Sequence, residues 1–413
     1  MIKRTLFIAL CTFLWTVLCG KDLTIAEYIK KTGDDPRLKG KLEMSGTFGG
    51  SKNTPLLKGV EFRTETKNFD IMQQKYAFRF YFKGLGETKS SNAVLQNYKD
   101  LYAAEYKIDM IDILLERYTL VLENIEIKKN IELLDSLTAV LEDKVAVLRK
   151  MSSISQDTSL TEIVDAEEKI TDIELEKIEL ENRANSIELM VMEQTGGDSK
   201  PAFHNEKLIT IDDIEKKILV MEKAEHEPDV LVEYRKQRVE LAESELQMEK
   251  AKTYDFFNYF SLDYDTDEWE TPRNSFSIGL AVNIPGIKND QVDISRKKAD
   301  LIEEKMKCET ESSENEKSIK NNIRSIKRQI KQYRVLLEKN RDSEASTSLA
   351  KYSAMEGADP LTILKIKERI IKNEMKMQSI LFRIYIRYIT LLNLTGVIPE
   401  NPDENHLLGS SAK

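Results

Sequence analysis

The chain has 413 residues, a formal net charge of −9 at pH 7 and a hydrophobic fraction of 41%. This acidic balance argues against general nucleic-acid binding, which depends on basic surfaces that neutralise phosphates. Beyond the first twenty residues no apolar run reaches about 18 residues, the length that suggests a membrane-spanning helix. Any insertion of this part of the chain into a membrane would therefore have to use β-strands, whose pattern is weaker in a sequence.

The first twenty residues have the pattern of a secretory signal peptide. Lys3 and Arg4 precede a largely apolar run over residues 5–18, close to the roughly 7–15 residues usual for a signal and shorter than a spanning helix. We predict that residues 1–20 are a signal peptide cleaved after Gly20. Cys19 leaves a second possibility open, in which the export signal is that of a lipoprotein and lipid is attached to this cysteine.

The rest of the chain divides into segments that differ in their pattern. A duplicated unit, described below, occupies most of it, and the residues before, between and after the two copies are shorter. We divide the exported chain into an N-terminal extension (21–58), a first repeat (59–196), an equatorial segment (197–227), a second repeat (228–396) and a short polar tail expected to be disordered (397–413).

The first repeat begins with two short segments whose residues alternate between two kinds of side chain. They lie at about residues 60–66 and 76–83, and alternation with a period of two is typical of strands with different faces. In the second segment, one face would carry Phe78, Phe80 and Phe82 and the other would carry Arg79, Tyr81 and Lys83. We predict a pair of strands joined by an external loop at residues 67–75.

A long helical hairpin follows this strand pair. No glycine occurs between Gly86 and Gly196, and no proline occurs between Pro55 and Pro201. Glycine and proline are the strongest local breakers of helices. Two sets of apolar residues recur in steps of three and four, and the second nearly continues the narrow stripe of the first, as is typical of coiled-coil packing. They are Ile111, Leu114, Tyr118, Val121 and Ile125, and then Leu134, Leu137, Leu141, Val145 and Leu148. Because residues 151–159 are polar and serine-rich, we expect a turn there between helices at 88–151 and 159–195.

The second half repeats the same order of elements. It has alternating segments at about residues 259–265 and 276–284, a stretch without glycine or proline after Gly286, a turn at 352–360 and a helix at 361–394. The residues after the two turns align at an offset of 201, and the strands align at an offset of 200. Internal repeats of this kind indicate a duplicated structural unit.

The four predicted strands raise a choice between a soluble half-buried sheet and a barrel in a membrane. Their apolar faces are rich in aromatic residues, their other faces are mostly polar, and the chain is exported, which favours the barrel. Four strands cannot close a barrel, and lipid does not tolerate unpaired sheet edges. A membrane location therefore requires several copies of the chain.

The sequence lacks the patterns of common catalytic and metal sites. The three histidines, His204, His226 and His406, are far apart and form no cluster with ligand spacing. No phosphate-binding glycine loop or nucleophilic serine elbow occurs. We therefore predict no catalytic residues, no cofactor and no metal, and we do not expect an enzyme.

The order of these elements resembles the TolC-like outer membrane factor family. Residues 228–252 resemble the family's segment that begins with a proline and runs along a helix into the third strand. Ile284, Pro285 and Gly286 resemble its link from strand to helix, and residues 388–396 resemble its closing helix. Each motif is degenerate alone, and their order over residues 60–396 carries the resemblance.

The resemblance implies a mainly α fold with a small β part. Long antiparallel coiled-coil hairpins would form an α-barrel, and four strands from each chain would contribute to a trimeric, twelve-stranded transmembrane β-barrel. The homotrimer would sit in outer-membrane lipid, extend into the periplasm and serve passively as an exit duct for a periplasmic adaptor and an inner-membrane pump, without binding nucleic acid. On this interpretation the barrel lumen candidates are Arg63, Arg79, Asp263 and Asn283.

The family resemblance also places the two turns at the periplasmic tip of the channel. Relatives narrow the tip with acidic residues in the second tip helix, where this chain has Ile363 and Ile366. Our candidate residues for a tip ring or gate are Glu162 and Asp165 of the first tip helix, balanced by Lys365 and Lys367 of the second. The alternative is that all four are ordinary solvated charges.

Two other functions remain open at the level of sequence. An exported periplasmic coiled-coil adaptor or scaffold would explain the hairpins and the acidity, but not the two aromatic-rich strand pairs or the duplication. A lyase built on long helices would lack any convergent polar site.

Overall fold

A computed structural model describes residues 22–49, 55–66, 74–154, 160–197, 200–224, 229–253, 257–266, 275–282, 291–341 and 359–409. The chain forms two compact units, one of residues 1–35, 110–229 and 316–413, and a second of residues 36–109 and 230–315. The predicted signal peptide, Cys19, Asn283 and the Ile284–Pro285–Gly286 link lie outside the described residues.

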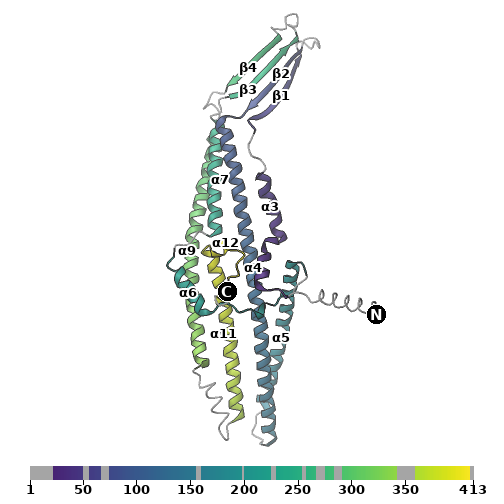
Figure 1. Ribbon diagram of the computed structural model, residues 1–413, viewed down its shortest axis with the longest axis vertical. Helices are drawn as coiled ribbons and strands as arrows, with labels where there is room; N and C mark the ends of the chain where they lie inside the picture. The colour runs from purple at the N-terminus through teal and green to yellow at the C-terminus, as the bar shows by residue number, and fades with distance from the viewer. Residues whose placement is uncertain are drawn as a thin grey trace, which may run out of the picture. The chain divides into compact units, whose positions relative to one another are not determined.

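The second unit contains one antiparallel sheet of four strands. The strands are β1 (Leu57–Thr66), β2 (Gln74–Phe82), β3 (Phe257–Asp265) and β4 (Phe276–Val282), and their order in the sheet is the order in the chain (Figure 1). The strand pairs of the two repeats join through β2 and β3, in which Phe78 lies opposite Leu262. The four strands lie within three residues of the positions predicted from alternation.

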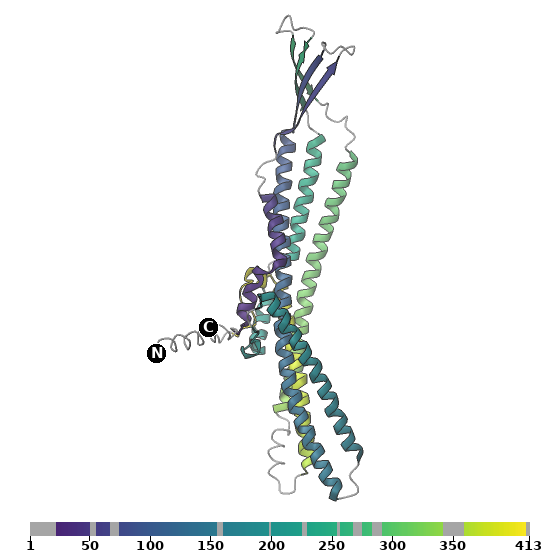
Figure 2. The ribbon, with the colours of Figure 1, turned by 90° about the vertical axis from the view of Figure 1, so that its right-hand side faces the viewer.

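Helices of the second unit pack through apolar and charged contacts. They are α3 (Pro36–Gly49), α7 (Val230–Thr253) and the first parts of α4 (Leu85–Ile154) and α9 (Gln291–Arg341). Leu241 of α7 packs against Val94 and Leu101 of α4, which places the two helices side by side (Figure 2). Lys297 of α9 pairs with Glu245 of α7 at 2.7 Å.

The first unit contains the helical hairpin and its counterpart from the second repeat. It comprises α5 (Leu160–Thr195), α11 (Pro360–Leu394) and the later parts of α4 and α9. From Leu134 to Leu148 the predicted stripe of α4 forms the seam with α5, where Leu141 clusters with Ile173 and Leu148 with Ile163. Among the described residues, no helix combines the length and apolar character needed to cross a membrane.

The first unit also contains short elements. Among them are α2 (Ile25–Lys30), the 3-10 helices η1 (Lys31–Asp34) and η3 (Phe203–Asn205), and α6 (Ile211–Met221). Arg117 of α4 is fully buried beside α2 and η1. It donates to the Tyr28 carbonyl at 2.6 Å, and its guanidinium lies 3.6 Å from the Asp35 carboxylate. A buried charge that is paired in this way fixes the N-terminal segment to α4.

We expected a disordered tail after Gly396, and this prediction is wrong for residues 397–409. Residues Val397–Glu400 form α12, and Leu407 is fully buried. The Tyr118 hydroxyl donates to the Glu404 carbonyl at 3.0 Å and accepts from the His406 backbone N–H at 3.1 Å. Burial of its few apolar residues and these hydrogen bonds hold the segment on α4.

We predict that Tyr118→Phe loosens this C-terminal segment. The variant leaves two backbone groups without their partner, and a buried group left unpaired costs about 1–3 kcal/mol. Limited proteolysis should cleave the C-terminal segment faster, and the denaturant midpoint should fall. Tyr106→Phe, at a half-buried tyrosine elsewhere on α4, is the control, and equal behaviour of the two variants would contradict the assignment.

The stability of the first unit should also fall at acidic pH through His406. Burial lowers the pKa of His406, whose Nε2 lies 3.1 Å from the Asn401 carbonyl oxygen. The folded state therefore favours the neutral ring. The stability that the neutral ring contributes to the folded state is complete above the ordinary pKa of about 6.5, and it is lost as the pH falls toward the lower pKa of the folded state. Denaturant midpoints from about pH 7.5 to about pH 5 should show this loss. His406→Gln should reduce it, and identical pH profiles would refute it.

Candidate functional site

The sheet carries a continuous apolar face that is open to solvent in the single chain. Cross-strand partners share a face, and the register pairs Phe62 with Phe78, Phe78 with Leu262, and Leu262 with Ile278. We call this the apolar face; its large side chains, which are 41–70% exposed, are Val60, Phe62, Phe78, Leu262, Phe276, Ile278, Leu280 and Val282. The facing of all four strands predicted from alternation is confirmed.

The opposite face of the sheet is polar and internally hydrogen-bonded. Glu61 accepts from Arg63 Nε at 2.8 Å and from the Tyr81 hydroxyl at 2.6 Å. Arg79 lies over the Tyr259 ring, 4.9 Å from its centroid. Three of the predicted lumen residues, Arg63, Arg79 and Asp263, therefore lie on this one face.

Gly279 makes room for one of the contacts on the polar face. Ser261 lies opposite Gly279 and donates a hydrogen bond to Asp263 at 3.0 Å. A Cβ at position 279 would approach the Ser261 hydroxyl oxygen at 2.4 Å. The glycine thus allows a close approach of two strands where their polar side chains interact.

The sheet has two edges that no strand of the described chain covers. Within the described residues, β1 pairs only with β2 and β4 pairs only with β3. The strands are 10, 9, 9 and 7 residues long. At about 3.3 Å per residue, nine residues span about 30 Å, which matches the hydrocarbon thickness of a bilayer.

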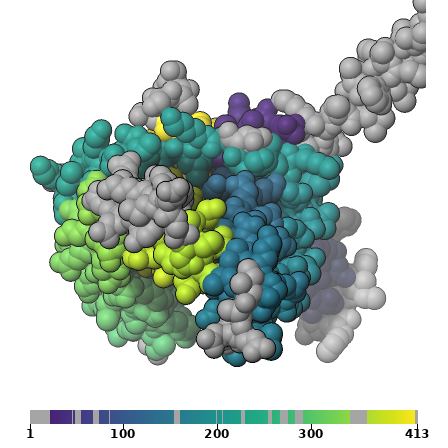
Figure 3. Space-filling view, turned by 90° about the horizontal axis from the view of Figure 1, so that it is seen from below, coloured from purple at the N-terminus to yellow at the C-terminus, as the bar shows by residue number. Residues whose placement is uncertain are grey.

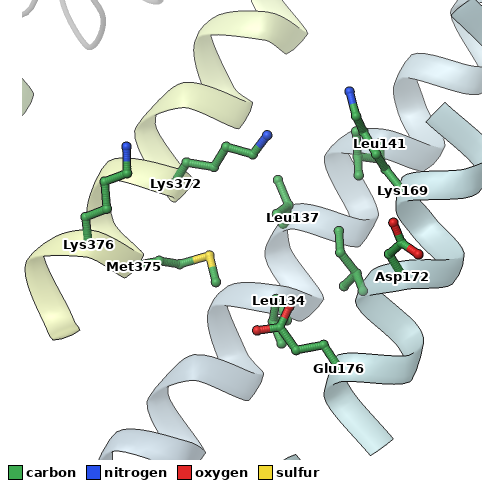
Figure 4. A pocket seen from close by; sticks show the side chains of 10 residues that line it. Leu134, Leu137, Leu141, Lys169, Asp172, Glu176, Lys372, Met375 and Lys376 are labelled. Carbon is green, nitrogen blue, oxygen red and sulfur yellow. The ribbon is translucent and has the colours of Figure 1, made fainter. Parts of the chain in front are cut away.

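A groove lies between the hairpin and α11 in the first unit. Its volume is about 400 Å³, and Leu134, Leu137, Leu141 and Ile173 line it together with Met375. Charged side chains stand around these apolar residues: Lys169, Asp172 and Glu176 from α5, and Lys372 and Lys376 from α11 (Figure 4). The groove offers an apolar strip with mixed charge on the α5 side and two lysines on the α11 side.

The predicted gate residues lie in the first turns of two helices. Glu162 and Asp165 are exposed near the start of α5, and Lys365 is exposed near the start of α11, where Lys367 is half-buried. The ends of α11 and of the α4–α5 hairpin appear side by side in Figure 3. No ion pair joins the acidic pair to either lysine among the described residues, so their role stays a prediction.

Asp359 is a residue at this end of α11 that the sequence analysis missed. Its carboxylate accepts from the backbone N–H groups of Leu361 and Thr362 at 3.1 and 3.2 Å, so it caps the helix. The hydrogen bond with the Thr362 hydroxyl is the main reason that the pKa of Asp359 is lowered. The Asp-Pro pair at a helix start is the signal that could have identified the cap.

The described residues contain no group of three or more histidine, cysteine, aspartate or glutamate side chains placed to hold a metal ion. The features with geometry suited to a function are therefore the two-faced sheet with open edges, the groove, and the charged helix ends.

Comparison with known proteins gives matches among solved structures alone. No protein family profile matches the chain, and no curated protein matches its sequence. A crystal structure of CusC, in work on folding and transmembrane channel formation, matches with a TM-score of 0.68 at 9% identity, over 91% of this chain and 92% of that one. The outer membrane protein VceC of Vibrio cholerae matches at 0.65, with 13% identity over 90% and 96%.

The open state of the Neisseria gonorrhoeae MtrE outer membrane channel matches with a TM-score of 0.65 at 11% identity, over 90% of this chain and 88% of that one. At these identities the likeness establishes the fold. The chain has the fold of TolC-like outer membrane channels, and the predicted fold class, mainly α with long hairpins and a small four-stranded part, is confirmed.

Proposed function

We propose that this chain, which has the fold of TolC-like outer membrane channels, is the passive outer-membrane exit duct of a tripartite efflux or type I secretion system and not an enzyme. The observation that carries the proposal is the sheet, which has an exposed apolar face, a polar opposite face and two uncovered edges. Each of these three properties has a distinct reason in a barrel that crosses a lipid bilayer.

The apolar face fits contact with lipid. Water-soluble sheets cover an apolar face with helices or a second sheet, because burial of one large apolar side chain is worth about 1.5–3 kcal/mol. Here Phe276, Ile278 and Leu280 are 66–70% exposed in the single chain. Lipid would bury this face, and the polar face with Arg63, Arg79 and Asp263 would then line a water-filled lumen. The lumen role of Asn283, which follows β4, is part of the same proposal.

The two uncovered edges support an oligomer. Backbone groups at a sheet edge in lipid need partners, so β1 of one copy would pair with β4 of the next until the barrel closes. We take the number of copies to be three, as the resemblance to the TolC-like family implies. Three sheets of four strands make a twelve-stranded barrel.

The helical end of the chain supports contact with an adaptor. The groove in Figure 4 would accept an apolar-striped adaptor helix, because its strip of leucines and Met375 is flanked by both lysines and carboxylates. The inner-membrane pump would supply energy, as this chain has no nucleotide-binding loop. Export by residues 1–20, with or without lipid on Cys19, would deliver the chain to the outer membrane.

A matched pair of arginine substitutions tests the membrane location. Ile278→Arg places a charge on the apolar face, where the cost near the bilayer midplane is about 2–4 kcal/mol. Ser277→Arg places the same charge on the polar face of the same strand. We expect Ile278→Arg to reduce assembly in the outer-membrane fraction and Ser277→Arg to preserve it. Release of the wild-type protein by osmotic shock without detergent would instead indicate a periplasmic scaffold.

Single-channel recording tests the proposed gate. Replacing both Glu162 and Asp165 with alanine removes the acidic side chains near the start of α5, which would bind cations and hold the tip closed. We expect weaker block by divalent cations and a higher open probability. The control replaces Glu142 and Asp143, two exposed acids in α4, with alanine. Unchanged block and opening in the first variant would show that the tip charges are only solvated.

A further inference from the structure

The four long helices of the first unit lie in a row with α5 and α9 at its ends. Leu137 and Leu141 of α4 pack with Ile173 of α5, and Met375 of α11 packs on the same cluster. The side chain of Asn340 on α9 contacts Met377 of α11 at 3.5 Å. The order is therefore α5, α4, α11 and α9, as Figures 1 and 3 show. Each end helix has one long neighbour in the row and an outer face directed away from it.

The outer face of α5 is apolar along its centre and acidic along its sides. The helix has eleven acidic and three basic residues. Its central stripe is formed by exposed side chains spaced for one helix face, and these are Val164, Leu175, Ile178 and Leu189, 54–67% exposed. Several exposed carboxylates flank this stripe, among them Glu168, Glu174, Glu179 and Glu193.

The outer face of α9 is basic. Residues 316–341 include nine basic and two acidic residues. The exposed side chains on the face opposite the buried stripe follow steps of three and four, and they are Lys317, Lys320, Arg324, Arg328, Lys331, Val335 and Lys339. Lys327 and Arg334 lie beside this face and pair instead with Glu222 at the end of α6 and with Glu215 of α6, each at 2.6 Å.

We propose that the acidic outer face of α5 docks on the basic outer face of α9 of a second copy of this chain. This inference rests on the proposed oligomeric channel and identifies the contact that joins its helical parts. The lysine and arginine stems would cover the exposed leucine and isoleucine side chains of α5, while their charged ends reach the flanking carboxylates. Neither face is complementary to itself, so the contact joins unlike faces and a series of such contacts closes into a ring.

Contacts within the first unit show which parts of the two faces lie at the same height. Lys177 of α5 pairs with Asp135 of α4 at 2.6 Å, and Met375 of α11 packs at Leu134. Asn340 of α9 lies beside Met377. Residues near 340 of α9 and near 178 of α5 are therefore level, and the two helices run in opposite directions from there.

In a ring about an axis parallel to the helices, residues at equal height meet. By this alignment Lys339 faces Glu179 and Arg324 faces Glu193 of the adjacent copy. The structure gives no ion pair to any of these four side chains within the chain's described residues, so their charges are available to a partner.

Charge reversal tests the proposed contact. One variant carries Glu179→Lys and Glu193→Lys, a second carries Arg324→Glu and Lys339→Glu, and a third carries all four changes. Light scattering in detergent measures the mass of each purified protein. We expect a trimer for the wild type, loss of the trimer in each two-site variant because like charges then meet, and recovery of the trimer in the four-site variant.

The control is Glu400→Lys with Asp403→Lys, which reverses two exposed charges of the C-terminal segment and should leave the trimer intact. Circular dichroism confirms that each variant retains its helices. A folded two-site variant that stays trimeric, or a folded four-site variant that does not recover, would overturn the inference. The proposed membrane channel fails separately, if the wild-type protein is released without detergent.

Discussion

The backbone hydrogen bonds at the edges of a sheet are the constraint on which the rest of this structure depends. Within the described part of the chain, the four-stranded sheet leaves one row of N–H and C=O groups open on β1 and another on β4. Water can satisfy these groups, whereas the hydrocarbon of a bilayer cannot. In the proposed membrane location a single chain would thus be incomplete, and its duplicated units would be segments of a larger closed wall.

The helical part of the chain also has a surface that the single chain leaves uncovered. Side chains of α5 cover one stripe against α4, while large apolar residues on the other side remain exposed. The groups that lack a covering surface here are apolar side chains rather than backbone N–H and C=O groups. The charged residues beside them can therefore determine which surface packs on them. The short elements around Arg117 serve a different purpose, because their buried ion pair and the hydrogen bonds of Tyr118 tie both ends of the described chain to α4.

Elements with strong periodic patterns could be predicted from sequence, and contacts between distant residues could not. The alternation around Phe78 and Phe276 fixed the facing of the strands, since a slip of one residue would turn every side chain over. The long helices followed from the absence of breakers. The ordered tail was missed because polar residues dominate it and the burial of Leu407 depends on tertiary packing. The buried Arg117 and the groove also arise from such packing.

The register between β2 and β3 has a consequence for the order of folding. Phe78 pairs with Leu262, so the two halves of the sheet meet across a long stretch of chain. Pairings of such high contact order form slowly, and the early β1–β2 hairpin would meanwhile expose aromatic residues and an unpaired edge. In the proposed export this hairpin would emerge long before its partners. A chaperone that shields the hairpin until β3 and β4 arrive would protect the nascent chain from aggregation.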